Sequence, residues 1–323
     1  MSNLDLMLEA FDKREQRRLE RRRLFKLGGG FAVGAAAGAV LGACSSSAGD
    51  AIAQAPPAPD NDPAILNFAL NLEYLEAQFY SYATFGTGLA AASLTGVGTQ
   101  GGVTATGAGM VPFTDPVVRN YAREIANDEV NHVNFLRSAL GSAAVAQPAI
   151  DISVGPNSAF SNAARAAGLI GPGQTFNPYA DDNSFLLGAY IFEDVGVTAY
   201  KGAAPLINNK VFLEAAAGIL AAEAYHAGLI RTVLYAKGVA TPSLRTSADA
   251  ISNARDSLDG ASDLDQGISG TPTESNIVPL DANGIAYSRT TGQVLNIVYL
   301  TAAVATGGGF FPNGVNGSIR TSG

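Results

Sequence analysis

The stretch IANDEVNH at residues 125–132 recurs in pattern as ILAAEAYH at residues 219–226. Each stretch places a glutamate three residues before a histidine, and the chain has no other histidine. Residues three apart share one face of a helix, so the two side chains of each pair would point together. Two such pairs, with one glutamate from each of two further helices, make the ligand set of a two-metal carboxylate site inside a four-helix bundle. The two pairs are Glu129/His132 and Glu223/His226.

The two further glutamates belong to a second internal repeat. NLEYLEAQFY at residues 71–80 and FEDVGVTAY at residues 192–200 each contain a glutamate followed seven positions later by a tyrosine. The chain is therefore predicted to form two helical hairpins, each with one lone glutamate and one Glu-x-x-His pair. A pseudo-two-fold axis between the hairpins would bring six metal ligands together. They are Glu73, Glu129, His132, Glu193, Glu223 and His226.

A seventh acidic residue, Glu76, lies one helical turn after Glu73 and leaves two interpretations open. It is either an additional ligand or a half-exposed helix residue. Its counterpart in the second repeat is Gly196, so an additional ligand would make the site asymmetric.

Other side chains near the ligands also have two interpretations. Tyr80 and Tyr200 are either core residues or hydrogen-bond donors that orient a ligand carboxylate. Asp128 and Asp194 each adjoin a ligand in the sequence, and either could orient a histidine across the bundle. The alternative to the whole site is a pair of surface Glu/His contacts, which would leave the repeat without a reason.

The N-terminus has the composition of an export signal. Residues 1–26 hold eight Lys/Arg and five Asp/Glu and end in RRRLFK, and 17 mostly small and apolar residues follow to Ala43. This order predicts a signal peptide that is removed from the mature chain. The arginine run resembles a twin-arginine signal, although Glu20 replaces the serine or threonine that often precedes the arginines. LGAC at residues 41–44 resembles a bacterial lipobox, which predicts lipidation of Cys44.

These signals predict an exported protein, periplasmic or at the cell surface, anchored to the membrane through Cys44. The alternative is an uncleaved anchor, but its apolar stretch is at the short limit for a spanning helix. Without residues 1–43 the chain has 12 Lys/Arg and 23 Asp/Glu, a net charge of −11. That acidity argues against nucleic acid as a partner. A homodimer is left open.

Helix boundaries follow from capping signals and hydrophobic periodicity. Asp62-Pro63 and Asp115-Pro116 are typical helix starts, and Gly238 is a typical stop. We expect four bundle helices in an up-down-up-down order, at residues 62–84, 115–140, 182–207 and 209–237. Between them we expect a loop at 86–113 with room for a short hairpin, and a connection at 141–182 with a short helix near 158–167.

The chain thus divides into a signal peptide (1–43), a tether (44–61), an all-α four-helix bundle (62–238) and a C-terminal extension (239–323). The extension is rich in Ser, Asp and Gly and is expected to contain helices at 247–258 and 289–304. We expect it to pack on the bundle, either as filling or as a lid over the metal site.

The segments that carry the glutamates and histidines resemble the ferritin-like superfamily, which includes ferritins, rubrerythrins and manganese catalases. FEDVGVTAYKGAA at residues 192–204 is similar to one branch, the exported bacterial ferritin-like domain proteins related to plant desiccation-related proteins. The resemblance continues to about residue 317, and it implies the same six ligands. The chain lacks the cysteine-based iron module of rubrerythrins.

Carboxylate oxygens and imidazole nitrogens suit iron or manganese. Two such ions bridged by glutamates would support two-electron chemistry with a small oxidant, oxygen or peroxide. The sequence therefore favours a di-iron or di-manganese oxidase, peroxidase or catalase that protects against oxidative stress. The alternative is a metal-binding structural or desiccation-protection protein without turnover.

Overall fold

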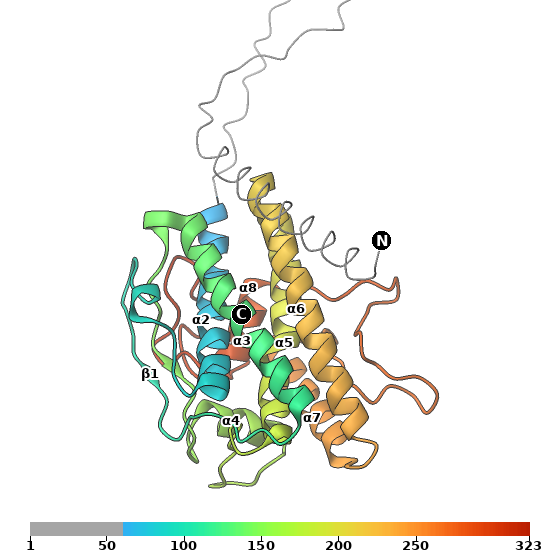
Figure 1. Ribbon diagram of the computed structural model, residues 1–323. Helices are drawn as coiled ribbons and strands as arrows, with labels where there is room; N and C mark the ends of the chain where they lie inside the picture. Colours follow the sequence, from blue (N-terminus) through green and yellow to red (C-terminus); the bar gives the residue numbers. More distant parts are fainter. Residues whose placement is uncertain (1–60) are drawn as a thin grey trace, which may run out of the picture. The chain divides into compact units, whose positions relative to one another are not determined.

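Four long helices form the framework of the protein in the computed structural model, which describes residues 61–323 (Figure 1). They are α2 (Asp62–Phe85), α3 (Pro116–Leu140), α5 (Asp182–Ala203) and α6 (Lys210–Lys237). The all-α prediction is confirmed, and no described helix is long and apolar enough to cross a membrane. The predicted signal peptide, Cys44 and the tether up to residue 60 lie outside the described residues.

The helices begin where short polar side chains satisfy the first free backbone N–H groups. The side chains of Asp115, Asp181 and Asn209 accept hydrogen bonds from the first turns of α3, α5 and α6. Asp62 is the first residue of α2 rather than its cap. Its carboxylate accepts instead from the backbone N–H groups of Asn208 and Asn209, at 2.7 and 2.8 Å.

The same contact occurs in the other half of the molecule. Asp182, at the start of α5, accepts hydrogen bonds from the backbone N–H groups of Thr114 and Asp115, at 3.1 and 3.2 Å. Thus α2 and α6 start at one end of the bundle, and α3 and α5 start at the other end, as Figure 1 shows. The predicted up-down-up-down order is therefore wrong, because α3 and α5 run parallel.

The order is instead up-down-down-up, and the chain between α3 and α5 returns along the length of the bundle. The helices in direct contact are still antiparallel, because α2 packs on α3 and α5, and α6 packs on the same two helices. The pseudo-two-fold axis that exchanges α2 with α5 is therefore perpendicular to the helices. A connection of 41 residues, Gly141–Asp181, is long enough for this return path.

That connection contains β2 (Ile150–Asp151) and α4 (Ala159–Ala166), the short helix predicted near 158–167. β2 pairs in parallel with β1 (Val103–Thr104) of the loop between α2 and α3. The hairpin considered for residues 86–113 is therefore wrong, since the strand in this loop pairs with a segment from another part of the chain.

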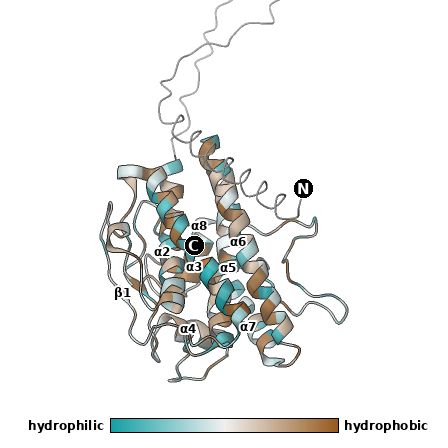
Figure 2. Ribbon diagram, in the orientation of Figure 1, coloured by the Kyte–Doolittle hydropathy of each residue, from teal (hydrophilic) through white to brown (hydrophobic). Residues whose placement is uncertain are grey.

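Burial differs between the helices. α2 and α5 are buried along most of their length, whereas α3 and α6 each keep an exposed face. Hydrophilic and hydrophobic residues accordingly alternate along α3 and α6 in Figure 2. This arrangement places α2 and α5 in the centre of the protein, with loops and C-terminal segments on their outer side.

The C-terminal extension contributes α7 (Ser243–Asp259), which packs on α5 and α6, and α8 (Thr291–Tyr299), which packs on α5 and α7. α7 is longer than predicted. α8 is shorter, because Thr290 and Gln293 form a capping box at its start and Leu300 ends it in a left-handed conformation with φ 56°.

Buried ion pairs connect the extension to the bundle. The carboxylate of Asp194 on α5 accepts from Arg231 Nη1 at 2.7 Å and from Arg255 Nη2 at 2.9 Å. Asp265 in turn accepts from Arg255 at 2.8 Å and from Arg289 at 2.9 Å. Asp194 therefore holds α7 rather than a histidine, and the suggestion that it orients a histidine is wrong.

We predict that Asp265→Asn lowers the free energy of unfolding by about 3–5 kcal/mol at neutral pH, since it leaves buried guanidinium groups short of a counter-charge. Burial alone would raise the pKa of Asp265, but Arg255 and Arg289 lower it below its usual value. The difference between wild type and variant should therefore shrink as the pH falls through this lowered pKa. Chemical denaturation measures it, with Asp263→Asn, an exposed neighbour, as the control. Equal losses for the two variants would contradict the prediction.

Candidate metal centre

The six predicted ligands converge midway along the bundle, one lone glutamate from each of α2 and α5 and one Glu/His pair from each of α3 and α6. The four glutamates are 0–2 % exposed and His226 is 4 % exposed. His132 is the least buried, with 12 % of its side chain exposed. The surface-contact alternative is therefore excluded by the burial of these side chains.

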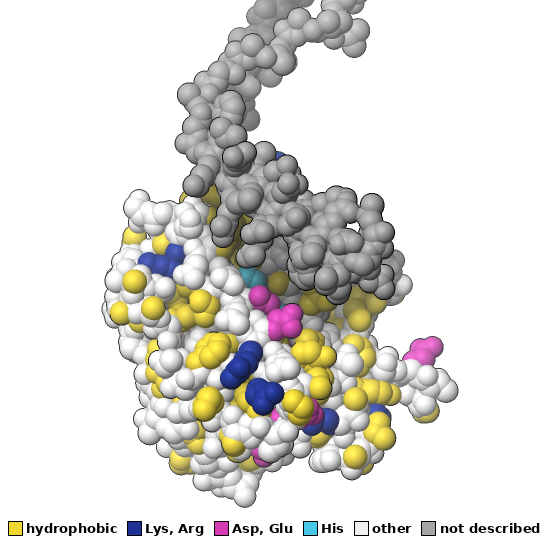
Figure 3. Space-filling view, in the orientation of Figure 1, with side chains coloured by type: hydrophobic (Ala, Val, Ile, Leu, Met, Phe, Trp, Pro, Cys, Tyr) yellow, Lys and Arg dark blue, Asp and Glu magenta, His cyan; other side chains and the backbone are white. Residues whose placement is uncertain are grey.

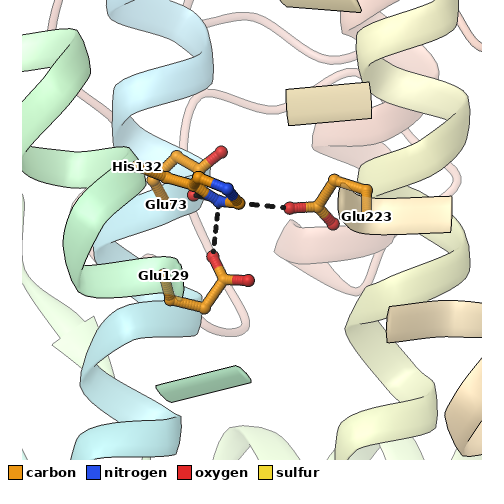
Figure 4. Close-up of side chains that lie close together, drawn as sticks. All are labelled: Glu73, Glu129, His132 and Glu223. Carbon is orange, nitrogen blue, oxygen red and sulfur yellow. Dashed lines mark hydrogen bonds and ion pairs between the residues drawn. The ribbon is translucent and has the colours of Figure 1, made fainter. Parts of the chain in front are cut away.

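The first half of the cluster surrounds His132, as Figure 4 shows. Its Nδ1 atom lies 3.2 Å from Glu73 Oε2, 3.5 Å from Glu129 Oε2 and 3.7 Å from Glu223 Oε1. Glu223 reaches this point from the opposite hairpin. One nitrogen and three carboxylate oxygens thus point at a common position.

The second half surrounds His226. Its Nδ1 atom lies 3.1 Å from Glu129 Oε1 and 3.6 Å from Glu193 Oε2. The centroids of the two imidazole rings are 6.2 Å apart. Glu129 presents one oxygen to each histidine, which places its carboxylate between the two halves.

Glu76 joins the cluster from α2. One of its oxygens lies within 4.8 Å of ligand oxygens of Glu193 and Glu223. Since Glu76 is only 6 % exposed, the half-exposed interpretation is wrong. A Cβ atom at Gly196, the counterpart position, would lie 2.2 Å from Glu223 Oε2, so the missing side chain there gives Glu223 its space.

The two tyrosines bond across the pseudo-two-fold axis. The Tyr80 hydroxyl donates to Glu193 Oε1, and the Tyr200 hydroxyl donates to Glu73 Oε1. Each lone glutamate is thus held by the tyrosine of the other hairpin, in addition to the core packing that tyrosine rings provide. Asp128 Oδ2 lies 3.3 Å from His226 Nε2, the ring nitrogen that faces away from the cluster.

Two arginines outside the cluster follow the two Glu-x-x-His pairs at equal offsets. Their partners were not predicted from the sequence. Arg137 donates to the Tyr74 hydroxyl at 2.5 Å. Arg231 donates to Asp194, which occupies the position equivalent to Tyr74. The equal offsets could have indicated these equivalent contacts, because each arginine binds the residue that follows a lone glutamate.

The donor atoms fit a metal centre. Buried polar atoms are normally paired, because desolvation without a partner costs free energy. Here Glu76 Oε2, Glu193 Oε2 and Glu223 Oε2 have no hydrogen-bond partner among the described residues, and the oxygens of Glu129 and His226 Nδ1 have only ion-pair contacts within the cluster. Carboxylates with two imidazoles are donors that suit iron or manganese. Glu73, Glu129, His132 and Glu223 would hold a metal on one side of the cluster, and Glu129, Glu193 and His226 would hold a metal on the other.

Comparison with known proteins agrees with this geometry. The family model of the ferritin-like domain matches residues 61–236. The chain belongs to the ferritin-like domain family. The match covers the whole bundle, from the start of α2 to the last turn of α6.

Two curated relatives extend the similarity beyond the bundle. The ferritin-like catalase Nec2 of Nesocodon mauritianus is 31 % identical over 79 % of this chain and 83 % of its own. The desiccation-related protein PCC13-62 of Craterostigma plantagineum is 30 % identical over 80 % of this chain and 84 % of its own. No solved structure matches this ferritin-like chain.

Protons compensate the buried charges when no metal is bound. Burial raises the pKa of Glu73 to about 7 and that of Glu193 to about 8. Burial alone would lower the pKa of the histidines, but the carboxylates around them raise it to about 11 for His132 and about 10 for His226. Burial opposes ionisation of Glu129 too, yet the two histidines hold its pKa well below the usual range.

We predict that this ferritin-like protein releases protons when it binds metal, because cations require deprotonated carboxylates and neutral imidazoles. Raised pKa values mean that the metal-free fold loses stability as the pH rises through about 7–8. The metal-bound fold holds none of these protons, so stabilisation by added Mn²⁺ should increase between about pH 6 and 8. Thermal unfolding with and without Mn²⁺ measures this increase, and titration calorimetry in two buffers measures the protons. A metal-induced shift in melting temperature that is the same at each pH would contradict the prediction.

Proposed function

We propose that the protein is a two-metal oxidoreductase of catalase type, which converts two molecules of hydrogen peroxide into two of water and one of oxygen. The observation that carries this proposal is the placement of Glu129 between two histidine-centred donor groups, 3.5 Å and 3.1 Å from their Nδ1 atoms. A shared carboxylate of this kind suits two adjacent cations rather than one.

Several features favour peroxide dismutation over chemistry that needs an electron donor. In dismutation one peroxide is oxidised and the other is reduced, so no further reductant is consumed. A bound pair of iron or manganese ions supplies the two-electron redox change. Cys44 is the only cysteine of the chain, so the chain offers no cysteine cluster for an electron-transfer centre. The similarity to a ferritin-like catalase supports the same choice.

The residues of this chain would position the donors and admit the substrate. Tyr80 and Tyr200 hold the lone glutamates through their hydroxyl groups, and Asp128 holds the ring of His226. His132 is the most exposed member of the cluster, with 12 % of its side chain exposed. Figure 3 shows that histidine and acidic side chains reach the surface next to one another. A small oxidant such as oxygen or peroxide would approach the cluster from this exposed side.

We further propose that the protein acts outside the cytoplasm, anchored to a membrane by lipids on Cys44. The basis is the arginine run at residues 21–23 and the LGAC sequence that ends at Cys44. The acyl chains would be the membrane contact, since the acidic mature chain offers little attraction to anionic lipids or nucleic acid.

A second candidate function is metal-stabilised protection without turnover. It is favoured by the similarity to the desiccation-related protein of Craterostigma plantagineum. In that case the same donor cluster would bind metal for stability alone. The two candidates share the metal and differ in whether peroxide is consumed.

We predict that wild-type protein contains about two iron or manganese ions per chain and consumes peroxide, and that Glu129→Ala loses both properties, because it removes the shared carboxylate. Elemental analysis and an oxygen-electrode assay measure metal and turnover. Glu124→Ala, an exposed residue of the same helix, should behave as wild type. Metal without turnover in the wild type would overturn the catalase proposal and favour the protective one.

We predict that Cys44→Ser moves the exported protein from the membrane fraction to the soluble fraction, because the serine hydroxyl cannot form the thioether that carries the lipid. Fractionation of a bacterial host with a twin-arginine pathway measures the distribution, and Ser45→Ala is the matched control. A Cys44→Ser protein that stays in the membrane fraction would contradict the lipid anchor and favour an uncleaved one.

A further inference from the structure

Two small cavities follow one another between α2 and α5, the helices in the centre of the protein. The inner cavity, of about 10 Å³, touches the metal centre, because Glu76 and Gly196 are among its walls. The outer cavity, also of about 10 Å³, reaches Ile207, which follows the exposed Leu206 in the turn before α6. Leu72 lines both cavities, so its side chain separates them. Together the cavities lead from the cluster towards the end of the bundle where α2 and α6 begin.

The walls of both cavities are almost entirely apolar. In the inner cavity the one polar side chain is Glu76, and the others come from aliphatic and aromatic residues of α2, α5, α8 and the segment around Phe310. In the outer cavity the one polar side chain is Tyr200, whose hydroxyl already donates to Glu73. An enclosed water needs two to four polar partners, and a polar molecule that loses its hydrogen bonds pays a cost in free energy. The cavities therefore suit a small apolar molecule better than water or peroxide.

The internal repeat shows that the cavities are specific to one end of the helix pair. At the other end, aromatic rings fill the space between α2 and α5. Phe79 stacks on Phe185 with ring centroids 5.8 Å apart and meets the edge of Phe192 at 5.6 Å. The three residues at the positions equivalent to these rings are smaller, and all of them line the outer cavity, namely Ala199, Ile65 and Leu72. The space is thus left by the exchange of large side chains for smaller ones.

The metal centre therefore has two unlike sides. On the side of His132, which is 12 % exposed, a small oxidant meets water and polar groups. The inner cavity lies on a different side, since none of its lining residues belongs to α3 or α6. A polar molecule can keep its hydrogen bonds on the first side and would lose them on the second.

We infer that the two cavities form a second route to the metal centre, which passes dioxygen and excludes peroxide and water. The inference rests on the proposed function, because dismutation releases dioxygen, an apolar product, inside a buried site. Passage between the cavities requires movement of the Leu72 side chain. This route lets the product leave without crossing the exposed side from which peroxide arrives.

Xenon tests the cavities without metal or turnover, because it binds in apolar cavities that hold no water. A crystal of the wild-type protein under xenon pressure should contain xenon in both cavities. Ala216 lines the outer cavity, so Ala216→Val should lose the outer xenon. Its exposed neighbour Ala217, changed to Val, should keep both sites. Ordered water in the wild-type cavities in place of xenon would overturn the inference.

Oxidation of the ferrous-loaded protein tests the route itself, because a path that releases dioxygen also admits it. Stopped-flow spectroscopy measures how fast dioxygen and, separately, hydrogen peroxide oxidise the bound iron. Ala216→Val should slow the reaction with dioxygen at least twofold and leave the reaction with peroxide unchanged, whereas Ala217→Val should match the wild type in both. Unchanged dioxygen rates, or equal slowing with both oxidants, would overturn the inference.

A second variant guards against a local distortion by Ala216→Val. Leu72→Phe gives this end of the helix pair the ring that Phe192 supplies at the other end, and it should also slow dioxygen selectively. Circular dichroism and elemental analysis check that each variant keeps its helices and its metal. If neither variant slowed dioxygen selectively, the cavities would be packing voids only.

The outcomes separate this inference from the proposed function. Selective slowing of dioxygen in a protein that does not dismutate peroxide would refute the catalase proposal and support the route. Dismutation in a protein whose variants react with dioxygen like the wild type would refute the route alone. A protein that binds no metal would refute both.

Discussion

The structure depends on a concentration of buried carboxylates whose charge must be compensated by protons or by bound cations. Five glutamates and two histidines share the centre of the bundle, and every glutamate among them is at most 6 % exposed. Moving ionised carboxylates out of water is costly unless positive charge compensates them. In the metal-free fold, protons on the glutamates and histidines compensate this charge, and two tyrosine hydroxyls donate hydrogen bonds to two of the carboxylates. Bound metal cations would replace these protons.

Stability in other regions has a different source. The ion pairs between α5, α6 and the C-terminal extension contain arginines and aspartates in balanced number, and each aspartate meets guanidinium groups at 2.6–2.9 Å. In this network each carboxylate is paired with at least one guanidinium group. It touches the cluster through Asp194, the residue after Glu193. The protein thus separates a network of arginine–aspartate pairs, which holds the extension in place, from a cluster in which carboxylates outnumber histidines.

The sequence predicted the helices and the gathering of the ligands because both depend on local spacing. Capping residues and hydrophobic periodicity gave helix limits close to those observed, and the repeat identified equivalent residues in the two hairpins. The order of the helices was wrong, because nothing local distinguishes a loop that turns back at one end from one that returns along the bundle. The partners of Asp182 decide that question, and they are distant in sequence. Asp194 was misjudged for the same reason, since its arginine partners come from α6 and α7. The lipid anchor and the export signal stay predictions, because they concern residues outside the described part.

The reciprocal bonds of Tyr80 and Tyr200 bear on the ancestry of the protein. Because each hairpin supplies the hydroxyl that the other requires, neither half can complete its own carboxylate. A lone hairpin with this sequence pattern would reach the same arrangement by pairing with an identical copy about a two-fold axis. Duplication and fusion of such a hairpin would then allow each half to change independently. The glutamate at position 76 and the glycine at the equivalent position 196 are such a difference, which an assembly of identical chains could not have.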